Sequence, residues 1–207
     1  MSGWTVVMRG LAPPPRSGSY SAPVAQYVAL LRGVNVGGNN IIRMSELKRC
    51  FEAHGFGNVA TYIQSGNVLF EAIERNPVDL SARIEDALLT RFGYQARIVL
   101  RSHGQMRAIV ADAPAGFGSQ PDLYRYDVVF LREALTAVEA MKDLKAREGV
   151  DQAFAGDGVC YFSRLASRAA QSYLSRIAAL PVYRSMTIRN WNTTAKLQAL
   201  MDARGED

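Results

Sequence analysis

Two segments of the chain combine residue types that can hold an anion. The first is the glycine- and asparagine-rich run RGVNVGGNN, which starts at Arg32, and the second is QSGN, residues 64–67. Glycines let a backbone approach a ligand closely, and backbone N–H groups near a helix N-terminus favour negative charge. An arginine can grip a phosphate or carboxylate with two hydrogen bonds. The chemistry that these segments predict is binding of a small anionic ligand, phosphorylated or carboxylated.

A purely structural interpretation of the same segments stays open. RGVNVGG is neither GxGxxG nor a P-loop with its GK[ST], so neither nucleotide fingerprint applies. Glycines after a strand often serve only to make a turn, and Arg32 could pair with a nearby acid. For residues 65–67 a hairpin turn is the simpler interpretation, although turn geometry does not require Gln64.

A third polar segment, RNWNTT, begins at Arg189, where a predicted strand meets a predicted helix. Asn192 or Thr193 is suited to cap that helix, and the Trp191 ring is suited to burial at the junction. Arg189 and Asn190 have no local role of this kind, so they either line the same cleft or hold two parts of the fold together. The predicted ligand-binding residues are Arg32, Asn35, Gly37, Gly38, Asn39, Gln64, Ser65, Asn67, Arg189, Asn190 and Asn192.

The sequence lacks the common catalytic patterns. It has no HExxH, no GxSxG elbow and no cluster of cysteine and histidine, so we expect no metal site and no cofactor, and whether the protein is an enzyme stays open. Cys50 and Cys160 lack CxxC spacing and are expected to be buried, reduced thiols. Adjacent acids such as Glu85 and Asp86 are typical of solvated surface.

The elements that would position the first two segments follow the order βαββαβ. An apolar run, a helical stripe of apolar residues and a hairpin turning at Ser65-Gly66 appear in turn, followed by a second helix opened by proline and one more strand. We expect strands over residues 27–31, 59–64, 67–71 and 96–100, and helices that begin at Ser45 and Pro77. In this plait the first strand runs parallel to the second, so the loop after Arg32 should face the hairpin tip.

The second half repeats that order after a short linking helix over residues 105–111. We expect strands over residues 126–131, 152–155, 159–162 and 185–189, and helices over residues 133–144, 166–179 and 194–204. The predicted fold class is α+β, with two tandem ferredoxin-like plaits of antiparallel strands and a C-terminal helix. We place a first lobe over residues 24–104 and a second over 105–207. Residues 1–23 are expected to be a disordered extension, or to reflect a start codon assigned too far upstream.

Three segments resemble one known family. They are YVALLRGVNVGGNN from Tyr27, TYIQSGNVLF from Thr61 and TIRNWNT from Thr187. In this order they are similar to the motifs of the bacterial domain-of-unknown-function 1697 family. The resemblance covers Gln26 to about Leu200 and implies the two-lobed α+β fold, but it supplies no reaction. The N-terminal extension departs from the family pattern, as does the loose segment between Gly116 and Tyr126.

Composition and charge bear on where the protein is located and on which functions remain open. The chain of 207 residues is 48% hydrophobic, with no apolar run long enough to span a bilayer and no secretion signal, so we expect a cytoplasmic protein without a membrane partner.

The net charge is +5, but two of the cationic residues, Arg9 and Arg16, lie in the predicted extension. A nucleic-acid-binding plait ranks below a small-ligand protein, because residues 67–71 do not match the RNA-recognition motif. A scaffold or oligomerising protein without a ligand is the third possibility, and the oligomeric state stays open.

Overall fold

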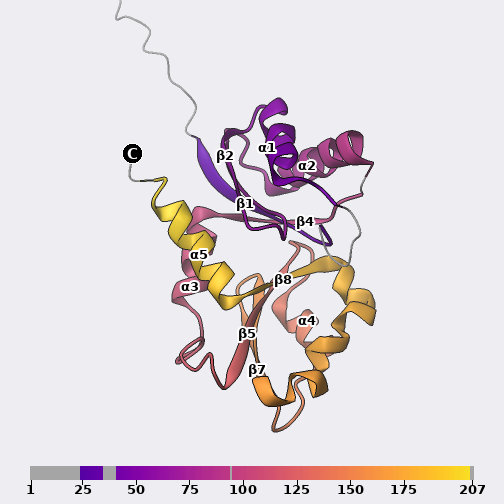
Figure 1. Ribbon diagram of the computed structural model, residues 1–207, viewed down its shortest axis with the longest axis vertical. Coiled ribbons are helices and arrows are strands. Elements are labelled where there is room, and N and C mark those ends of the chain that lie inside the picture. The colour runs from indigo at the N-terminus through magenta and orange to yellow at the C-terminus, as the bar shows by residue number, and fades with distance from the viewer. Residues whose placement is uncertain (1–23, 35–40, 94, 206–207) are drawn as a thin grey trace, which may run out of the picture.

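The computed structural model describes residues 24–34, 41–93 and 95–205 (Figure 1). The predicted extension over residues 1–23 lies outside these described residues. So does the stretch 35–40 of the glycine-rich run, which includes four of the predicted ligand-binding residues.

The first lobe is a four-stranded antiparallel sheet covered on one face by two helices. Its strand order is β2-β3-β1-β4, which is the order of a ferredoxin-like plait. Phe51, Phe70 and Ile84 are central to the core between the sheet and these helices. The elements are β1 (Ala25–Leu31), α1 (Met44–Ala53), β2 (Gly57–Tyr62), β3 (Asn67–Ala72), α2 (Pro77–Phe92) and β4 (Ile98–Ser102).

The second lobe repeats this sheet with the equivalent order β6-β7-β5-β8. The predicted class of two tandem ferredoxin-like units is thereby confirmed. The strands are β5 (Tyr124–Leu131), β6 (Asp151–Gly156), β7 (Val159–Leu165) and β8 (Met186–Asn190). The helical segments beside them are α4 (Ala137–Asp143) and the 3₁₀ helices η1 (Ala166–Gln171), η2 (Tyr173–Ala179) and η3 (Pro181–Ser185).

Two helices of the second lobe were predicted wrongly. Residues 166–179 form the separate 3₁₀ turns η1 and η2 rather than one α-helix, because the Ser172 side chain accepts a hydrogen bond from Leu174 N and starts a new turn. The buried residues of η2, Leu174 and Ile177, are three apart, which suits three residues per turn. Helix α4 begins at residue 137 rather than 133, because Thr136 and Glu139 form a capping box there.

The start of the last helix also differs from the prediction. Helix α5 (Trp191–Asp202) begins three residues earlier than expected, and its N-cap is Asn190, whose side chain accepts from Thr193 N at 2.7 Å. The predicted caps, Asn192 and Thr193, lie inside the first turn. Helix α1 likewise begins before the expected cap Ser45, with Arg43 in the N-cap position.

The two lobes repeat each other in register as well as in order. In the first sheet Val28 pairs with Arg101, and in the second Val128 pairs with Arg189. Strand β4 runs directly into α3 (His103–Ala111), just as β8 runs into α5, and the two helices pack against each other. Figure 1 shows them beside the two sheets. The inner faces of both sheets and these helices share one hydrophobic core, which includes Leu30.

No helix among the described residues is both long and apolar enough to cross a membrane.

Candidate functional site

The end of β1 and the tip of the β2–β3 hairpin lie together, as the plait topology predicted. Leu31 N donates to Gly66 O at 2.8 Å. A Cβ atom on Gly66 would come within 2.9 Å of Leu31 Cβ and 3.3 Å of Val34 Cβ, so glycine permits this close approach. The hairpin tip also holds Ile63 in the left-handed region, with φ of 47°, where a β-branched side chain is strained.

Arg189 joins this hairpin tip to the second lobe. Its Nη2 donates to the carbonyl oxygens of Leu31 at 2.8 Å and Gly66 at 3.3 Å, and its Nε donates to Asn67 Oδ1 at 2.5 Å. Ser65 O accepts a further bond from Nη2 at 3.0 Å. The side chain is only 8% exposed, and burial lowers the pKa of its guanidinium to about 10, so it still carries its charge at neutral pH. Of the two roles left open for Arg189, these contacts support holding the lobes together.

Arg101 makes the reciprocal connection from the first lobe. Its Nη2 donates to Leu131 O at 2.7 Å and to Gly158 O at 2.5 Å, at the end of β5 and the tip of the β6–β7 hairpin. Burial also lowers the pKa of this guanidinium to about 10. Each lobe thus supplies one buried arginine that donates to two backbone carbonyls of the other lobe. The two pairs of carbonyls, at the end of β1 or β5 and at the following hairpin tip, are equivalent in the two lobes. Arg101 was not among the predicted residues, although its register with Val28 matches that of Arg189 with Val128.

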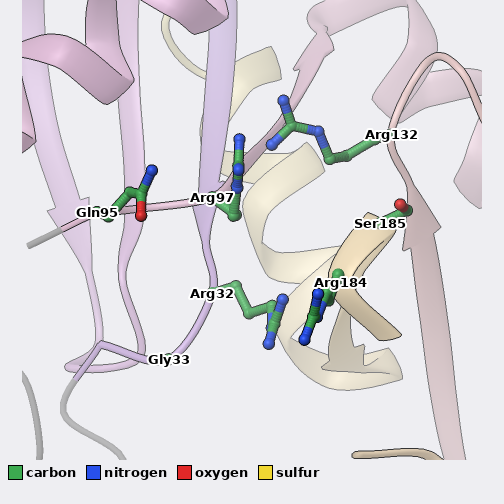
Figure 2. Close-up of a pocket in the computed structure, with 7 residues that line it drawn as sticks. All are labelled: Arg32, Gly33, Gln95, Arg97, Arg132, Arg184 and Ser185. Atoms are coloured by element: carbon green, nitrogen blue, oxygen red, sulfur yellow. The ribbon is translucent and has the colours of Figure 1, made fainter. Parts of the chain in front are cut away.

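Arg32 faces a pocket between the two lobes. Its Cζ lies 4.6 Å from the centre of the Tyr183 ring in the second lobe, a cation–π contact. The cavity has a volume of about 630 Å³. Figure 2 shows its lining residues, which we call the arginine pocket: Arg32, Gly33, Gln95, Arg97, Arg132, Arg184 and Ser185. The residues of the hairpin tip, which the loop after Arg32 was expected to face, are not among the described residues that line this pocket.

One carboxylate forms ion pairs with two of the pocket arginines. Glu85 Oε1 lies 2.7 Å from Arg132 Nη1, and Glu85 Oε2 lies 3.5 Å from Arg97 Nη1. Oε1 also accepts a hydrogen bond from Ile98 N at 3.0 Å. The sequence placed Glu85 among solvated surface acids, and this was wrong, because its side chain is only 18% exposed and links α2 to both lobes.

The predicted ligand-binding residues therefore fall into distinct places. Arg32 lines the arginine pocket, Asn67 and Arg189 are buried in the contact between the lobes, and Asn190 caps α5. Gln64 and Asn192 are exposed and Ser65 is half-buried. Asn35, Gly37, Gly38 and Asn39 lie outside the described residues. Ligand binding at all these positions stays a prediction.

Sequence reasoning missed most of the arginine pocket. Arg132 follows Leu131 at the end of β5 just as Arg32 follows Leu31 at the end of β1, so aligning the two repeats would have paired them. Arg97 and Arg184 lie just before β4 and β8, the edge strands through which the lobes meet. No local pattern marks them, because only the packing of the lobes brings them to one cavity.

The described residues offer no cluster of three or more histidine, cysteine or acidic side chains that could hold a metal ion. The polar groups of the arginine pocket are chiefly guanidinium donors, together with a carboxamide and a hydroxyl. These groups suit a ligand rich in anionic oxygen atoms.

Comparisons with known proteins give a family and a fold. Residues 24–161 match the model of a family described as a protein of unknown function, DUF1697. No curated protein matches the chain. A solved structure of the conserved bacterial protein SP0830 from Streptococcus pneumoniae is similar with a TM-score of 0.75 and 24% identity, over 87% of this chain and 99% of that chain. At this identity the likeness shows the fold alone.

Proposed function

Since the chain belongs to the DUF1697 family, whose description assigns neither ligand nor reaction, we propose a function from the geometry of the site. The protein binds a small anionic ligand, phosphorylated or carboxylated, in the arginine pocket between its two lobes. This function keeps the ligand class that the sequence predicted and keeps Arg32 as a binding group, but Arg97, Arg132 and Arg184 take the place of the hairpin tip.

The observation that carries the proposal is the excess of positive charge in one cavity. Four arginines line it, and the carboxylate of Glu85 forms ion pairs with two of them, Arg97 and Arg132. Like charges that share a cavity repel one another, and an anion relieves this repulsion. Planar guanidinium groups also match the oxygen pairs of phosphate and carboxylate.

The size and position of the pocket favour a small molecule over a nucleic acid. A volume of about 630 Å³ lies within the range of metabolite sites, and a boundary between two lobes is a common place for them. RNA-binding plaits use an open sheet face that carries aromatic side chains. Here Tyr27 and Phe70 belong to the buried core under α1 and α2, and Val28 and Leu69 on the opposite face belong to the shared core. Both faces of this sheet are thus occupied.

A binding experiment on one exposed arginine tests the proposal. In a thermal-shift screen of sugar phosphates, nucleotides and organic acids, at least one compound should stabilise the protein, and Arg184→Gln should weaken its binding about tenfold or more through loss of a charge-assisted bond. Arg184 is exposed, so this variant should fold normally. The matched control is Arg176→Gln, which removes an exposed arginine of η2 outside the pocket.

The same experiment separates a ligand-binding protein from a scaffold. If no anion stabilises the wild-type protein, or if the two variants respond alike to every compound that does, the pocket does not select the ligand. The protein would then be better described as one whose arginines serve only to join the lobes.

A further inference from the structure

A second cavity lies in the second lobe, at the opposite end of β5 from the arginine pocket. It has a volume of about 280 Å³ and is lined by β5, β6, β7 and the loop that precedes β5. Among the described residues, none lines both this cavity and the arginine pocket. Aromatic residues make up only 9% of the chain, yet four of them line this small cavity, which we call the aromatic pocket: Phe117, Tyr124, Tyr126 and Phe154.

One wall of the aromatic pocket is a row of residues across the second sheet. Tyr126 pairs with Ser163, and Ser163 pairs with Gln152. Paired residues of neighbouring strands lie on the same face of a sheet. This row therefore faces the same way as the next one, in which Val128 pairs with Tyr161 and both side chains belong to the shared core. The pocket thus continues the core-facing side of the sheet beyond the core itself.

The loop that forms the other wall is fixed by aromatic contacts. The Phe117 ring packs edge to face on three rings, with centroid distances of 4.9 Å to Tyr126, 5.4 Å to Tyr161 and 5.2 Å to Trp191. Gly118 has a φ of 84° and makes room for the Trp191 indole, because a Cβ atom there would clash with it. A pocket whose walls are fixed in this way loses little conformational freedom when a ligand binds.

The polar groups of the aromatic pocket are neutral. As far as the structure describes its lining, no side chain there is charged, and the polar groups include the carboxamides of Gln120 and Gln152 and the hydroxyl of Ser163. Carboxamides and hydroxyls both donate and accept hydrogen bonds. Tyr126 Oη accepts from Gln120 N at 3.3 Å, so its own hydrogen is available to another acceptor. A charged ligand would find no opposite charge on these walls, whereas a neutral ring with donors and acceptors at its edge fits them.

From these features we propose that the aromatic pocket binds a nucleobase, either free or as part of a nucleoside. Bases stack on aromatic side chains, which the pocket supplies from β5, β6 and the loop. A glutamine carboxamide presents a donor and an acceptor side by side, which is the pattern that reads the edge of a base. A volume of about 280 Å³ suits one such ring rather than a nucleic-acid strand. This site is separate from the arginine pocket, and neither depends on the other.

Calorimetric titration with uncharged probes tests this ligand class. The probes are adenosine, guanosine, cytidine and uridine, and the comparison compounds are ribose and methyl glucoside, which carry the hydroxyl groups without a base. None of them has a phosphate or carboxylate, so they do not test the arginine pocket. At least one nucleoside should bind the full chain with a Kd about tenfold or more below that of either sugar, because only the nucleoside brings a ring that stacks.

Two variants then locate the bound nucleoside. Phe154→Ala should raise its Kd about tenfold through loss of a stacking surface. Phe154 is 42% exposed, so this variant should fold normally, and the matched control is Tyr173→Ala, which removes an aromatic ring of equal exposure in η2, outside the pocket. Gln152→Leu, also at an exposed position, should narrow the difference in Kd between the preferred nucleoside and the other three, because it removes hydrogen bonds to the edge of the base.

Three results would overturn the inference. The first is that no nucleoside binds more tightly than ribose and methyl glucoside, and equally tight binding of a sugar would identify a carbohydrate site instead. The second is that Phe154→Ala and Tyr173→Ala bind the nucleoside as well as each other. The third is that Gln152→Leu keeps the full preference among the four bases. None of these results bears on the anion site, which the thermal-shift screen tests on its own.

Discussion

Two arginines near the end of β1 illustrate how similar residues take different roles. Arg189 is buried, and its donors are used by Leu31, Gly66 and Asn67. Arg32 lies against the Tyr183 ring and lines a cavity. Both were predicted to bind the ligand, but the structure gives only Arg32 a position on a pocket wall. Burial and hydrogen-bond partners, which the sequence does not display, make this difference.

Ile63 allows a prediction about backbone strain. A β-branched residue in the left-handed region costs about 1–2 kcal/mol, whereas asparagine tolerates that region well. The Ile63→Asn variant should therefore be more stable than the Ile73→Asn variant, by about 1 kcal/mol in the free energy of unfolding. Ile73 is the matched control, because it is also exposed, at 64% against 48%, and does not have a positive φ. Urea denaturation of both variants measures the difference, and equal stabilities would show that the tip is unstrained.

At the scale of elements, the sequence indicated the strands more accurately than the helices. Apolar runs and glycine turns marked each strand of the described residues, because hairpin geometry demands specific residues at the tips. Residues 166–179 contain good helix formers and were predicted as one helix, yet the capping side chain of Ser172 divides this region into two short turns. The cap of α5 was missed because several polar residues compete for it within RNWNTT.

Gly66 tests the contact between β1 and the hairpin tip. Gly66→Ala should destabilise the protein by more than about 2 kcal/mol, because it combines a left-handed φ of 71° with a Cβ only 2.9 Å from Leu31 Cβ. Gly93→Ala is the control, since φ is 63° there and nothing lies within 4 Å of the new Cβ. Gly93→Ala should lower the free energy of unfolding by only about 1 kcal/mol, the cost of holding alanine at a left-handed φ. If chemical denaturation showed equal losses of unfolding free energy in the two variants, the hairpin tip would be able to shift and accommodate the added methyl group.

At the scale of the whole molecule, the two lobes form one structure because each depends on the other for buried hydrogen bonds and apolar cover. The reciprocal arginines, the packing of α3 on α5 and the shared core all cross the boundary. The arginine pocket exists only in this arrangement, since each lobe supplies two of its arginines. The motifs therefore predicted the family and the two-lobed fold, whereas most of the pocket could not be found without the packing of the lobes.

The connection through Arg189 should be essential for stability. Arg189→Leu removes the buried donor of the Leu31 carbonyl oxygen and of Asn67 Oδ1, and each group left unsatisfied costs about 1–3 kcal/mol. We expect a loss of about 3 kcal/mol or more in the free energy of unfolding. Arg107→Leu, at an exposed position of α3, is the control and should change stability by less than about 0.5 kcal/mol. A loss no larger than that of the control would show that the lobes hold together without this arginine.

The central claim is that the cavity between the lobes holds an anion, and a crystal grown with tungstate tests it most directly. Tungstate has the shape and charge of phosphate, and its anomalous scattering locates it without ambiguity. We predict a tungstate peak in the cavity, within hydrogen-bonding distance of the guanidinium groups of Arg32 and Arg184, which line it together. A peak at the hairpin tip beside Ser65 and Gly66 instead, or no peak in the cavity at all, would contradict the account.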